Sequence, residues 1–215
     1  MTRSELAALL NSPLVAELQG FSDDGDHPEP RPKKTLTPAS VLIPLINHGT
    51  ALTVLFTQRT AHLNDHAGQI SFPGGRRDDC DNDAASTALR ETEEEVGLPR
   101  SRIEVLGRIP EYTTGTGFLV TPVVGWIEPP VSFNPDPFEV AEVFEVPFDF
   151  LMNPANHRLE SAMFKGRMRS YYALPYNGRY IWGATAGMLM SLYRVLARAR
   201  GEAVHDTTTA PADSG

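Results

Sequence analysis

The sequence predicts an α/β (α+β) sandwich, in which several strands surround one central helix and a second helix lies near the end of the chain. Apolar runs of strand length, separated by turn residues, recur between residues 39 and 128. Helical patterns occupy residues 83–96 and 184–200, and the second of these is clearly amphipathic. With 215 residues, 41% of them hydrophobic, the chain suits one domain with a substantial core.

The two ends of the chain differ in composition from its middle. Residues 3–18 have helix-forming composition, with Ser4 as the expected cap and Pro13 as a break or restart. Residues 22–35 are polar and rich in proline, which is typical of an extended linker. The chain therefore divides into an N-terminal helix and polar linker (1–35), a main domain (36–200) and a disordered tail (201–215).

The strands of the main domain are predicted from short apolar runs. Residues 39–47 and 51–59 flank a His-Gly-Thr turn, which favours a β-hairpin, and residues 66–75 predict a short strand that ends in a Pro-Gly-Gly turn. Further elements are expected downstream: strands in 103–112 and 117–128, a loop, short strand and helical turn in 134–158, and a hairpin around a Tyr-Asn-Gly turn in 168–183.

The charge and cysteine content exclude several classes of protein. A net charge of −8 argues against general nucleic-acid binding, because no basic surplus neutralises phosphates. An anionic small molecule remains compatible if metal ions or a few arginines bridge the two negative partners. Cys80 is the only cysteine, which excludes an internal disulfide and a cysteine-rich metal site. No apolar run suits a signal peptide or a membrane span, so we expect no membrane partner and a cytoplasmic protein.

Four glutamates lie within five positions of the central helix, in the stretch ALRETEEEVGL (88–98). At about 100° per residue, Glu91, Glu94 and Glu95 share one flank while Glu93 points away, and we expect Glu93 to be dispensable. Like charges so placed repel each other by a few tenths of a kcal/mol per pair, a cost that Mg²⁺ offsets by bridging carboxylates to phosphates. A solvated acidic face is the alternative. A separate stripe is expected to be buried: Ala85, Leu89, Thr92 and Val96.

Gly74 and Gly75, which precede this helix, extend the glutamate pattern into a longer family motif. Residues 75–98 resemble the Nudix box, which reads Gly, five residues, Glu, seven residues and Arg-Glu-U-x-Glu-Glu-x-Gly-U, where U is bulky and apolar. Residues 90–98 match its end, with Thr92 at the first apolar place. Fourteen residues lie between Gly75 and Arg90, where the general box has thirteen. The box's first glutamate is missing, and Asp81 or Asn82 lies in its neighbourhood.

The segment upstream narrows the resemblance. Residues 54–75, VLFTQRTAHLNDHAGQISFPGG, resemble the coenzyme A pyrophosphatase subgroup of the Nudix family, which carries L-L-T-x-R-[ST]-x-x-L-x-x-H-x-G-x-x-x-F-P-G-G before a box of this longer spacing. Phe56 replaces the second leucine. The residues that match are Leu55, Thr57, Arg59, Thr60, Leu63, His66, Gly68, Phe72, Pro73, Gly74 and Gly75. The resemblance spans roughly residues 36–197.

This resemblance implies a Nudix fold, with a mixed β-sheet between helices and the box as loop–helix–loop. It also implies hydrolysis of a substituted diphosphate by water with Mg²⁺ or Mn²⁺. By position, Glu94 and Glu95 would be the main metal ligands, Glu91 a ligand or water-activating base, and the Gly75 carbonyl a lesser ligand. Arg90 would hold a glutamate through a charge-assisted hydrogen bond, with a surface salt bridge as the alternative.

Five residues outside the helix are candidates for substrate binding or for assisting the box. Arg59 and His66 belong to the subgroup segment and could contact phosphate oxygens, although His66 could equally make a structural hydrogen bond within its turn. Arg76 follows the glycines and could also meet phosphate. Glu139 and Glu142 are alternatives for a further acid that serves as metal ligand or base, and the sequence does not choose between them.

The preferred function is a metal-dependent hydrolase that splits coenzyme A into 3′,5′-ADP and 4′-phosphopantetheine. The basic stretch 157–169 could bind the 3′-phosphate. One alternative is a Nudix enzyme for another nucleoside diphosphate derivative, such as ADP-ribose or a dinucleotide. Another is a catalytically silent Nudix domain that senses a nucleotide. A small molecule is thus the expected partner, and a homodimer is possible.

Overall fold

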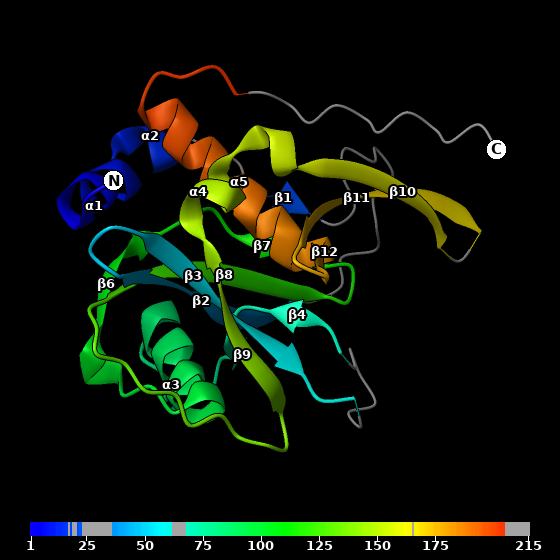
Figure 1. Ribbon diagram of the computed structural model, residues 1–215. Coiled ribbons are helices and arrows are strands. Elements are labelled where there is room, and N and C mark those ends of the chain that lie inside the picture. The colour runs from blue at the N-terminus through cyan, green and yellow to red at the C-terminus, as the bar shows by residue number, and fades with distance from the viewer. Residues whose placement is uncertain (17, 19–20, 23–35, 62–67, 165, 205–215) are drawn as a thin grey trace.

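The computed structural model describes residues 1–16, 18, 21–22, 36–61, 68–164 and 166–204 (Figure 1). Within them, nine strands form a mixed sheet: β1 (Phe21–Ser22), β2 (Thr37–Asn47), β3 (Leu52–Arg59), β4 (Ile70–Ser71), β5 (Gly74–Arg76), β6 (Ile103–Arg108), β7 (Tyr112–Thr113), β8 (Phe118–Ile127) and β9 (Val140–Pro147). Three further strands form a second sheet: β10 (Arg158–Phe164), β11 (Arg167–Tyr176) and β12 (Arg179–Trp182).

Helices lie on both faces of the main sheet, as expected for a sandwich (Figure 1). They are α1 (Arg3–Leu10), α2 (Pro13–Ala16), α3 (Ala84–Val96), α4 (Phe148–Met152) and α5 (Gly183–Ala199), with 3₁₀ turns at Arg100–Arg102 and Pro154–Asn156. Helix α3 covers one face, while α5 and the short helices around it cover the other. None of the helices in the described ranges is long and apolar enough to cross a bilayer.

The main sheet follows the order β1-β7-β8-β2-β3-β4, with β5 beside β2, β6 beside β8 and β9 beside β3. The predicted hairpin is confirmed, since β2 and β3 pair antiparallel with Leu45 opposite Val54. Strands β2 and β8 are parallel over ten residue pairs, from Thr37 with Phe118 to Ile46 with Ile127. The sheet is therefore mixed, as the family resemblance implied.

Strand β2 explains why the sheet has a core on each side. Leu42 and Ile46 are buried in the core beneath α3, whereas Ile43 and Leu45 are buried in the core on the α5 side. Successive side chains of a strand point to opposite faces. A strand buried on both faces therefore reads as the nearly continuous apolar run that the sequence shows here.

Helix α3 begins and ends where the sequence predicts. Its N-cap is Asp83, whose carboxylate accepts a 2.7 Å hydrogen bond from the Ser86 backbone nitrogen. Its C-cap is Gly97 with φ 69°, a left-handed conformation that favours glycine. The stripe predicted to be buried faces the core: Thr92 and Val96 are buried, and Ala85 and Leu89 pack against the same cluster.

The second sheet projects from the body of the molecule as a long β10–β11 hairpin (Figure 1). The predicted hairpin around the Tyr-Asn-Gly turn is present as β11–β12, with positive φ at Asn177 (47°) and Gly178 (77°). The guanidinium of Arg179, just after this turn, donates to the Glu142 carboxylate and lies 4.3 Å from the Phe144 ring centre. These contacts tie the small sheet to β9.

Two local predictions need correction. The cap of α1 is Thr2 and not Ser4, because the Thr2 hydroxyl accepts from the Glu5 nitrogen while the Glu5 carboxylate accepts from the Thr2 nitrogen. The Pro-Gly-Gly segment was expected to be a turn, yet its glycines begin strand β5, where Gly75 pairs with Ser40. The pairing with β2 overrides the weak strand preference of glycine.

The N-terminal segment contributes to the core. Leu6 and Leu10 of α1 are buried in the cluster that α5 also lines, and Pro13 restarts the chain as α2. Residues 23–35 of the predicted linker, and residues 205–215 of the predicted tail, lie outside the described part of the chain.

Candidate active site

Arg90 lies at the centre of the polar contacts around α3. Its Nε and Nη2 donate to the two carboxylate oxygens of Asp81 at 3.1 and 2.9 Å. Its Nη1 donates to Glu91 and to Glu94, both at 2.9 Å, and Nη2 also donates to the Arg76 carbonyl at 3.0 Å. The Arg90 side chain is only 14% exposed. Arg90 therefore holds the flank of the helix that carries the glutamates, and is more than a surface salt bridge.

The partnership with Arg90 changes the acidity of Asp81. The hydrogen bonds from Arg90 hold the pKa of the Asp81 carboxyl well below its usual range, and the same bonds raise the pKa of the Arg90 guanidinium. Asp81 also accepts a 2.9 Å hydrogen bond from the Asp78 nitrogen, which closes the loop before α3. Both side chains stay charged throughout the physiological range, so the contact is a permanent ion pair.

The two glycines bring β5 against the helix. A Cβ atom on Gly75 would lie 2.5 Å from the Glu91 carboxylate, so a side chain at this position would displace that carboxylate. A Cβ atom on Gly74 would lie 2.4 Å from the Ser40 carbonyl oxygen of β2. Both positions therefore require glycine for close approach. The Glu91 side chain lies directly beside the Gly75 backbone. This proximity is required if the Glu91 carboxylate and the Gly75 carbonyl are to bind the same metal ion.

Glu95 is the most perturbed carboxyl group of this helix. It is 7% exposed, and burial raises its pKa to about 8, with the negative charges of Glu139 and Glu91 adding to the shift. The positive charge of Arg59 and a hydrogen bond from the Gly74 backbone act in the opposite direction. Glu91 is half-buried, and burial again is the first cause that raises its pKa, with Glu94 and Glu139 contributing.

Glu139 reaches this cluster from the loop that enters β9. The Thr60 nitrogen donates to the Glu139 carbonyl at 3.0 Å, and the Asp136 nitrogen donates to the Glu95 carbonyl at 2.9 Å. These bonds fix the loop to the end of β3 and to the end of α3. The charge of Glu139 consequently bears on both Glu91 and Glu95.

Glu142 lies on the other face of the sheet. It shares its face of β9 with Phe144, which packs in the core on the α5 side, and its carboxylate accepts from Arg179. The sequence left Glu139 and Glu142 open as the further acid. The structure brings Glu139, and not Glu142, to the glutamates of α3.

The remaining substrate-binding candidates differ in their positions. Arg59 ends β3, its charge acts on Glu95, and its Nε is buried without a hydrogen-bond partner among the described residues. Arg76 is exposed, with its guanidinium 5.3 Å from the Phe118 ring centre. His66 lies outside the described residues. Of the basic substrate-binding candidates, Arg59 is thus the one whose charge acts on a carboxylate of α3.

The chemistry of these donors fits a hard divalent cation. Glu91, Glu95 and Glu139 offer only oxygen atoms as ligands. The charge of Glu139 raises the pKa of Glu91 and Glu95, and the charge of Glu91 raises that of Glu95, an effect that a bound cation would reverse. In the described part of the chain, no three Asp, Glu, His or Cys side chains converge as a ready-made metal site. Arg90 instead engages oxygen atoms of Glu91 and Glu94. A bound cation would therefore compete with Arg90 for these carboxylates.

Comparison with known proteins decides the family. The NUDIX domain model matches residues 36–165, well over half of the chain. The chain belongs to the Nudix hydrolase family. Its relatives include proteins described as "Uncharacterized Nudix hydrolase NudL". The one from Pectobacterium atrosepticum is 40% identical over 165 residues, 77% of this chain and 85% of the relative. The one from Escherichia coli K12 is 40% identical over 154 residues, 72% of this chain and 80% of the relative.

Solved structures of the same family are also similar to this chain. The Nudix hydrolase RenU from M. smegmatis is 22% identical, with a TM-score of 0.48, over 75% of this chain and 87% of that protein. Nudix hydrolases generally use divalent metal ions and act on small nucleotide-like substrates that contain a diphosphate.

Within this Nudix hydrolase, Asp81 occupies the neighbourhood of the missing first glutamate of the box. The alternative, Asn82, uses its carbonyl to accept from Arg77 at 3.1 Å and is exposed. Glu93 points away from the cluster as predicted and pairs with Arg100 at 2.7 Å. Its dispensability remains a prediction.

Sequence reasoning missed the residue that anchors the Glu139 loop. Thr60 was matched only as part of the upstream segment, yet its nitrogen and hydroxyl bind the Glu139 and Phe138 carbonyls. The available signal was the position directly after Arg59 in the upstream pattern, which requires Ser or Thr and therefore a hydroxyl group that can form a hydrogen bond. Arg179, which ties Glu142 to the small sheet, left no local signal because its partner is 37 residues away.

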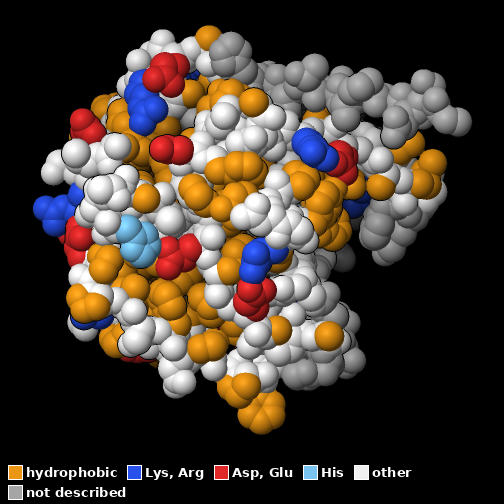
Figure 2. All heavy atoms as spheres, in the orientation of Figure 1, with side chains coloured by type: hydrophobic (Ala, Val, Ile, Leu, Met, Phe, Trp, Pro, Cys, Tyr) orange, Lys and Arg blue, Asp and Glu red, His pale blue; other side chains and the backbone are white. Residues whose placement is uncertain are grey.

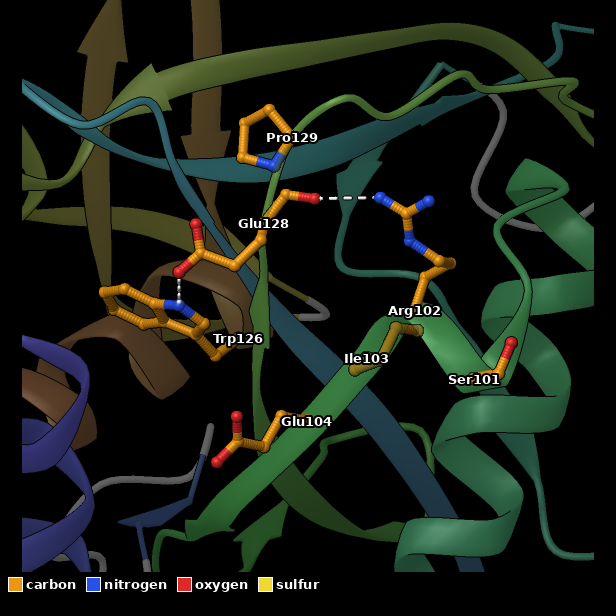
Figure 3. A pocket seen from close by; sticks show the side chains of 7 residues that line it. All are labelled: Ser101, Arg102, Ile103, Glu104, Trp126, Glu128 and Pro129. Atoms are coloured by element: carbon orange, nitrogen blue, oxygen red, sulfur yellow. Dashed lines mark hydrogen bonds between the residues drawn. The ribbon is translucent and has the colours of Figure 1, made fainter.

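A hollow of about 300 Å³ lies elsewhere on the molecule (Figure 3). Its lining groups already bind one another: Trp126 Nε1 donates to the Glu128 carboxylate at 2.7 Å, and Arg102 donates to the Glu128 carbonyl at 3.0 Å. Its lining residues are Ser101, Arg102, Ile103, Glu104, Trp126, Glu128 and Pro129. None of them belongs to the group of Glu91, Glu95 and Glu139. We assign it no part in the chemistry.

Proposed function

We propose that this Nudix hydrolase uses Mg²⁺ or Mn²⁺ to hydrolyse the diphosphate of coenzyme A or its derivatives. The products would be 3′,5′-ADP and 4′-phosphopantetheine, since water adds to one phosphorus atom and the other phosphate leaves. The observation that carries the proposal is the cluster of Glu91, Glu95 and Glu139 beside Gly74–Gly75, with Arg59 next to it.

The cluster suits diphosphate chemistry because burial and mutual repulsion destabilise the ionised carboxylates, and a divalent cation would relieve both effects. Glu91, Glu94 and Glu95 would hold the metal, with the Gly75 carbonyl as a further ligand. When bound, the cation would neutralise the diphosphate and lower the pKa of a water molecule. Arg59 would bind a phosphate oxygen through its guanidinium, whose Nε has no hydrogen-bond partner among the described residues.

Two groups are suited to remove the proton from the attacking water. Burial raises the pKa of Glu91, which makes it a better base near neutral pH than an exposed carboxylate. Glu139 is exposed and held on a fixed loop, so it can serve if Glu91 is occupied as a ligand. Arg90 does not act on the substrate in this scheme. It positions Glu91 and Glu94 through its hydrogen bonds.

The narrower choice of coenzyme A rests on the segment 54–75, whose residues resemble the subgroup pattern. The same cluster would serve ADP-ribose or a dinucleotide equally well. A reducing, cytoplasmic location is part of the proposal, because the single cysteine, Cys80, is exposed and free.

The test is product analysis with coenzyme A, ADP-ribose and NADH, each with Mg²⁺ or Mn²⁺. Wild type, Glu95→Gln and Glu93→Gln would be compared, because Glu93 lies on the same helix but pairs with Arg100 outside the cluster. We expect 3′,5′-ADP from coenzyme A with wild type and Glu93→Gln, and none with Glu95→Gln. Cleavage of ADP-ribose alone would refute the choice of substrate. Nucleotide binding without any cleavage would indicate a sensor.

A further inference from the structure

Phe138 is an aromatic side chain left in solvent on the loop that leads into β9 and also carries Glu139. It is 74% exposed, the highest value among the large exposed hydrophobic side chains of the described residues. A surface phenylalanine so exposed contributes almost nothing to the core, because its apolar area stays in water. Figure 2 shows hydrophobic side chains protruding at the lower edge of the molecule, where Figure 1 draws the loop that leads into β9.

The backbone that carries Phe138 is fixed on both sides. Its nitrogen donates to the Asp136 carboxylate at 2.9 Å, and its carbonyl accepts from the Thr60 hydroxyl at 2.8 Å. Asp136 is itself bound to the Glu95 carbonyl of α3 at 2.9 Å. The loop is therefore tied to both β3 and α3, so the ring is presented from a preorganised position and loses little backbone entropy on binding a ligand.

The position of Phe138 relates it to the chemistry. Asp136, two residues before Phe138, binds the Glu95 carbonyl, and Glu139, the next residue, bears electrostatically on Glu91 and Glu95, so the loop that carries the ring lies at the end of α3 that holds these glutamates. Asp136 and Glu139 flank Phe138 with negative charge. That charge disfavours a phosphate or carboxylate group on the ring, but it does not repel a neutral heteroaromatic base.

We propose that Phe138 is the surface on which the adenine ring of the substrate stacks. This inference rests on the proposed function, because a substrate with an adenosine half places a flat neutral ring within a few bonds of the diphosphate. The phosphates would lie at the cluster and Arg59, and the base would lie against the ring at its rim. The flexible pantetheine arm has no planar face to match the ring, so its binding would not depend on Phe138.

The experiment compares Phe138→Ala, Phe138→Leu and Phe138→Trp with wild type. Val105→Ala is the control, because Val105 is an exposed hydrophobic side chain (40%) on β6, a strand to which no part in binding is assigned. Binding of ADP with Mg²⁺ is measured by calorimetry, binding of 4′-phosphopantetheine is measured in parallel, and kcat and KM are measured for the substrate that wild type cleaves. Melting temperatures report on folding.

We expect Phe138→Ala to raise the Kd for ADP and the KM by at least about fivefold, in line with base stacking on aromatic side chains. Phe138→Leu should lose nearly as much, since it keeps apolar volume without a flat ring, whereas Phe138→Trp should restore binding. Values of kcat, affinity for 4′-phosphopantetheine and melting temperature should not change, and Val105→Ala should match wild type.

Three results would overturn the inference: no ADP binding by wild type, an unchanged Kd in Phe138→Ala, or an equal loss of 4′-phosphopantetheine affinity. The fluorescence of Phe138→Trp, corrected by the wild-type signal, should be quenched by ADP if the ring and base are in contact. If coenzyme A is not cleaved but ADP binding still depends on the ring, the proposed substrate fails and the stacking role stands.

Discussion

Arg90 donates two hydrogen bonds to the Asp81 carboxylate, of 3.1 Å from Nε and 2.9 Å from Nη2. Its Nη1 donates to Glu91 and Glu94. This geometry links the loop before α3 to the glutamates on the helix. A buried charge pair of this kind is costly to break, because removing one partner leaves the other charge without compensation. Asp81 therefore determines where Arg90 lies, and through it where two carboxylates lie.

Replacing Asp81 by Asn should destabilise the protein. Its side chain is 3% exposed, so the Arg90 charge would lose its main buried partner, and the free energy of unfolding should fall by about 3 kcal/mol. Urea unfolding followed by circular dichroism measures this. Asp79→Asn is the control, because Asp79 is an exposed carboxylate of the same loop. Equal midpoints for the two variants would contradict a structural role for the pair.

The raised pKa of Glu95 predicts how stability depends on pH in the absence of metal. Between its ordinary pKa of 4.5 and the folded value of about 8, the folded state keeps a proton that the unfolded state has lost. The free energy of unfolding should therefore fall as pH rises through this window, by an amount on the order of a few kcal/mol. Below pH 4.5 the contribution is fully present, and above pH 8 it is gone.

Glu95→Gln provides the direct check of this pH dependence. The variant cannot ionise at this position, so its stability in EDTA should vary less between pH 5 and 8, and it should exceed wild type at pH 8. Glu93→Gln should keep the wild-type slope, since Glu93 is paired with Arg100 outside the cluster. A wild-type profile that is flat or rises over this range would show that Glu95 is not buried as described.

Some features of this fold are readable from sequence because their signals are local. The limits of α3 follow from Asp83 as its cap, Gly97 as its stop and the 3.6-residue period between them. Thr2 and Glu5 form a Thr-x-x-Glu capping pattern, a local signal that marks Thr2 and not Ser4 as the cap of α1. The ion pair between Arg90 and Glu94 also has a local signal, because a spacing of four residues places the two side chains together on a helix.

Other features depend on contacts that no local pattern encodes. The register of β9 against β3, where Glu142 lies opposite Gln58 and the pairing shifts at Arg59, decides which acid faces the box. The burial of Glu95 depends on the loop that crosses the end of α3. A one-residue change of register would have exchanged the faces, so alternation alone could not choose between Glu139 and Glu142.

Glu139 and Glu142 should respond differently to the same substitution. Glu139→Gln removes a carboxylate from the cluster, and we expect kcat to fall at least about tenfold, as for loss of a ligand or base. Glu142→Gln should leave kcat near wild type while loosening the contact between β9 and the small sheet, since its partner is Arg179. Steady-state kinetics and hydrogen exchange of residues 176–182 separate the two effects. A larger loss of kcat in Glu142→Gln would reverse the assignment.

Metal binding should release a proton from Glu95. At pH 7 this carboxyl is largely protonated in the metal-free protein because its pKa is about 8, and a cation can bind only the ionised form. Calorimetric titration with Mg²⁺ or Mn²⁺ in buffers of different ionisation enthalpy should therefore show close to one proton released per site. Glu95→Gln should release none, and metal should raise the melting temperature of wild type more than that of the variant. A binding enthalpy independent of the buffer would mean that the cation does not engage Glu95, and the ligand assignment would then pass to Glu91, Glu94 and Glu139.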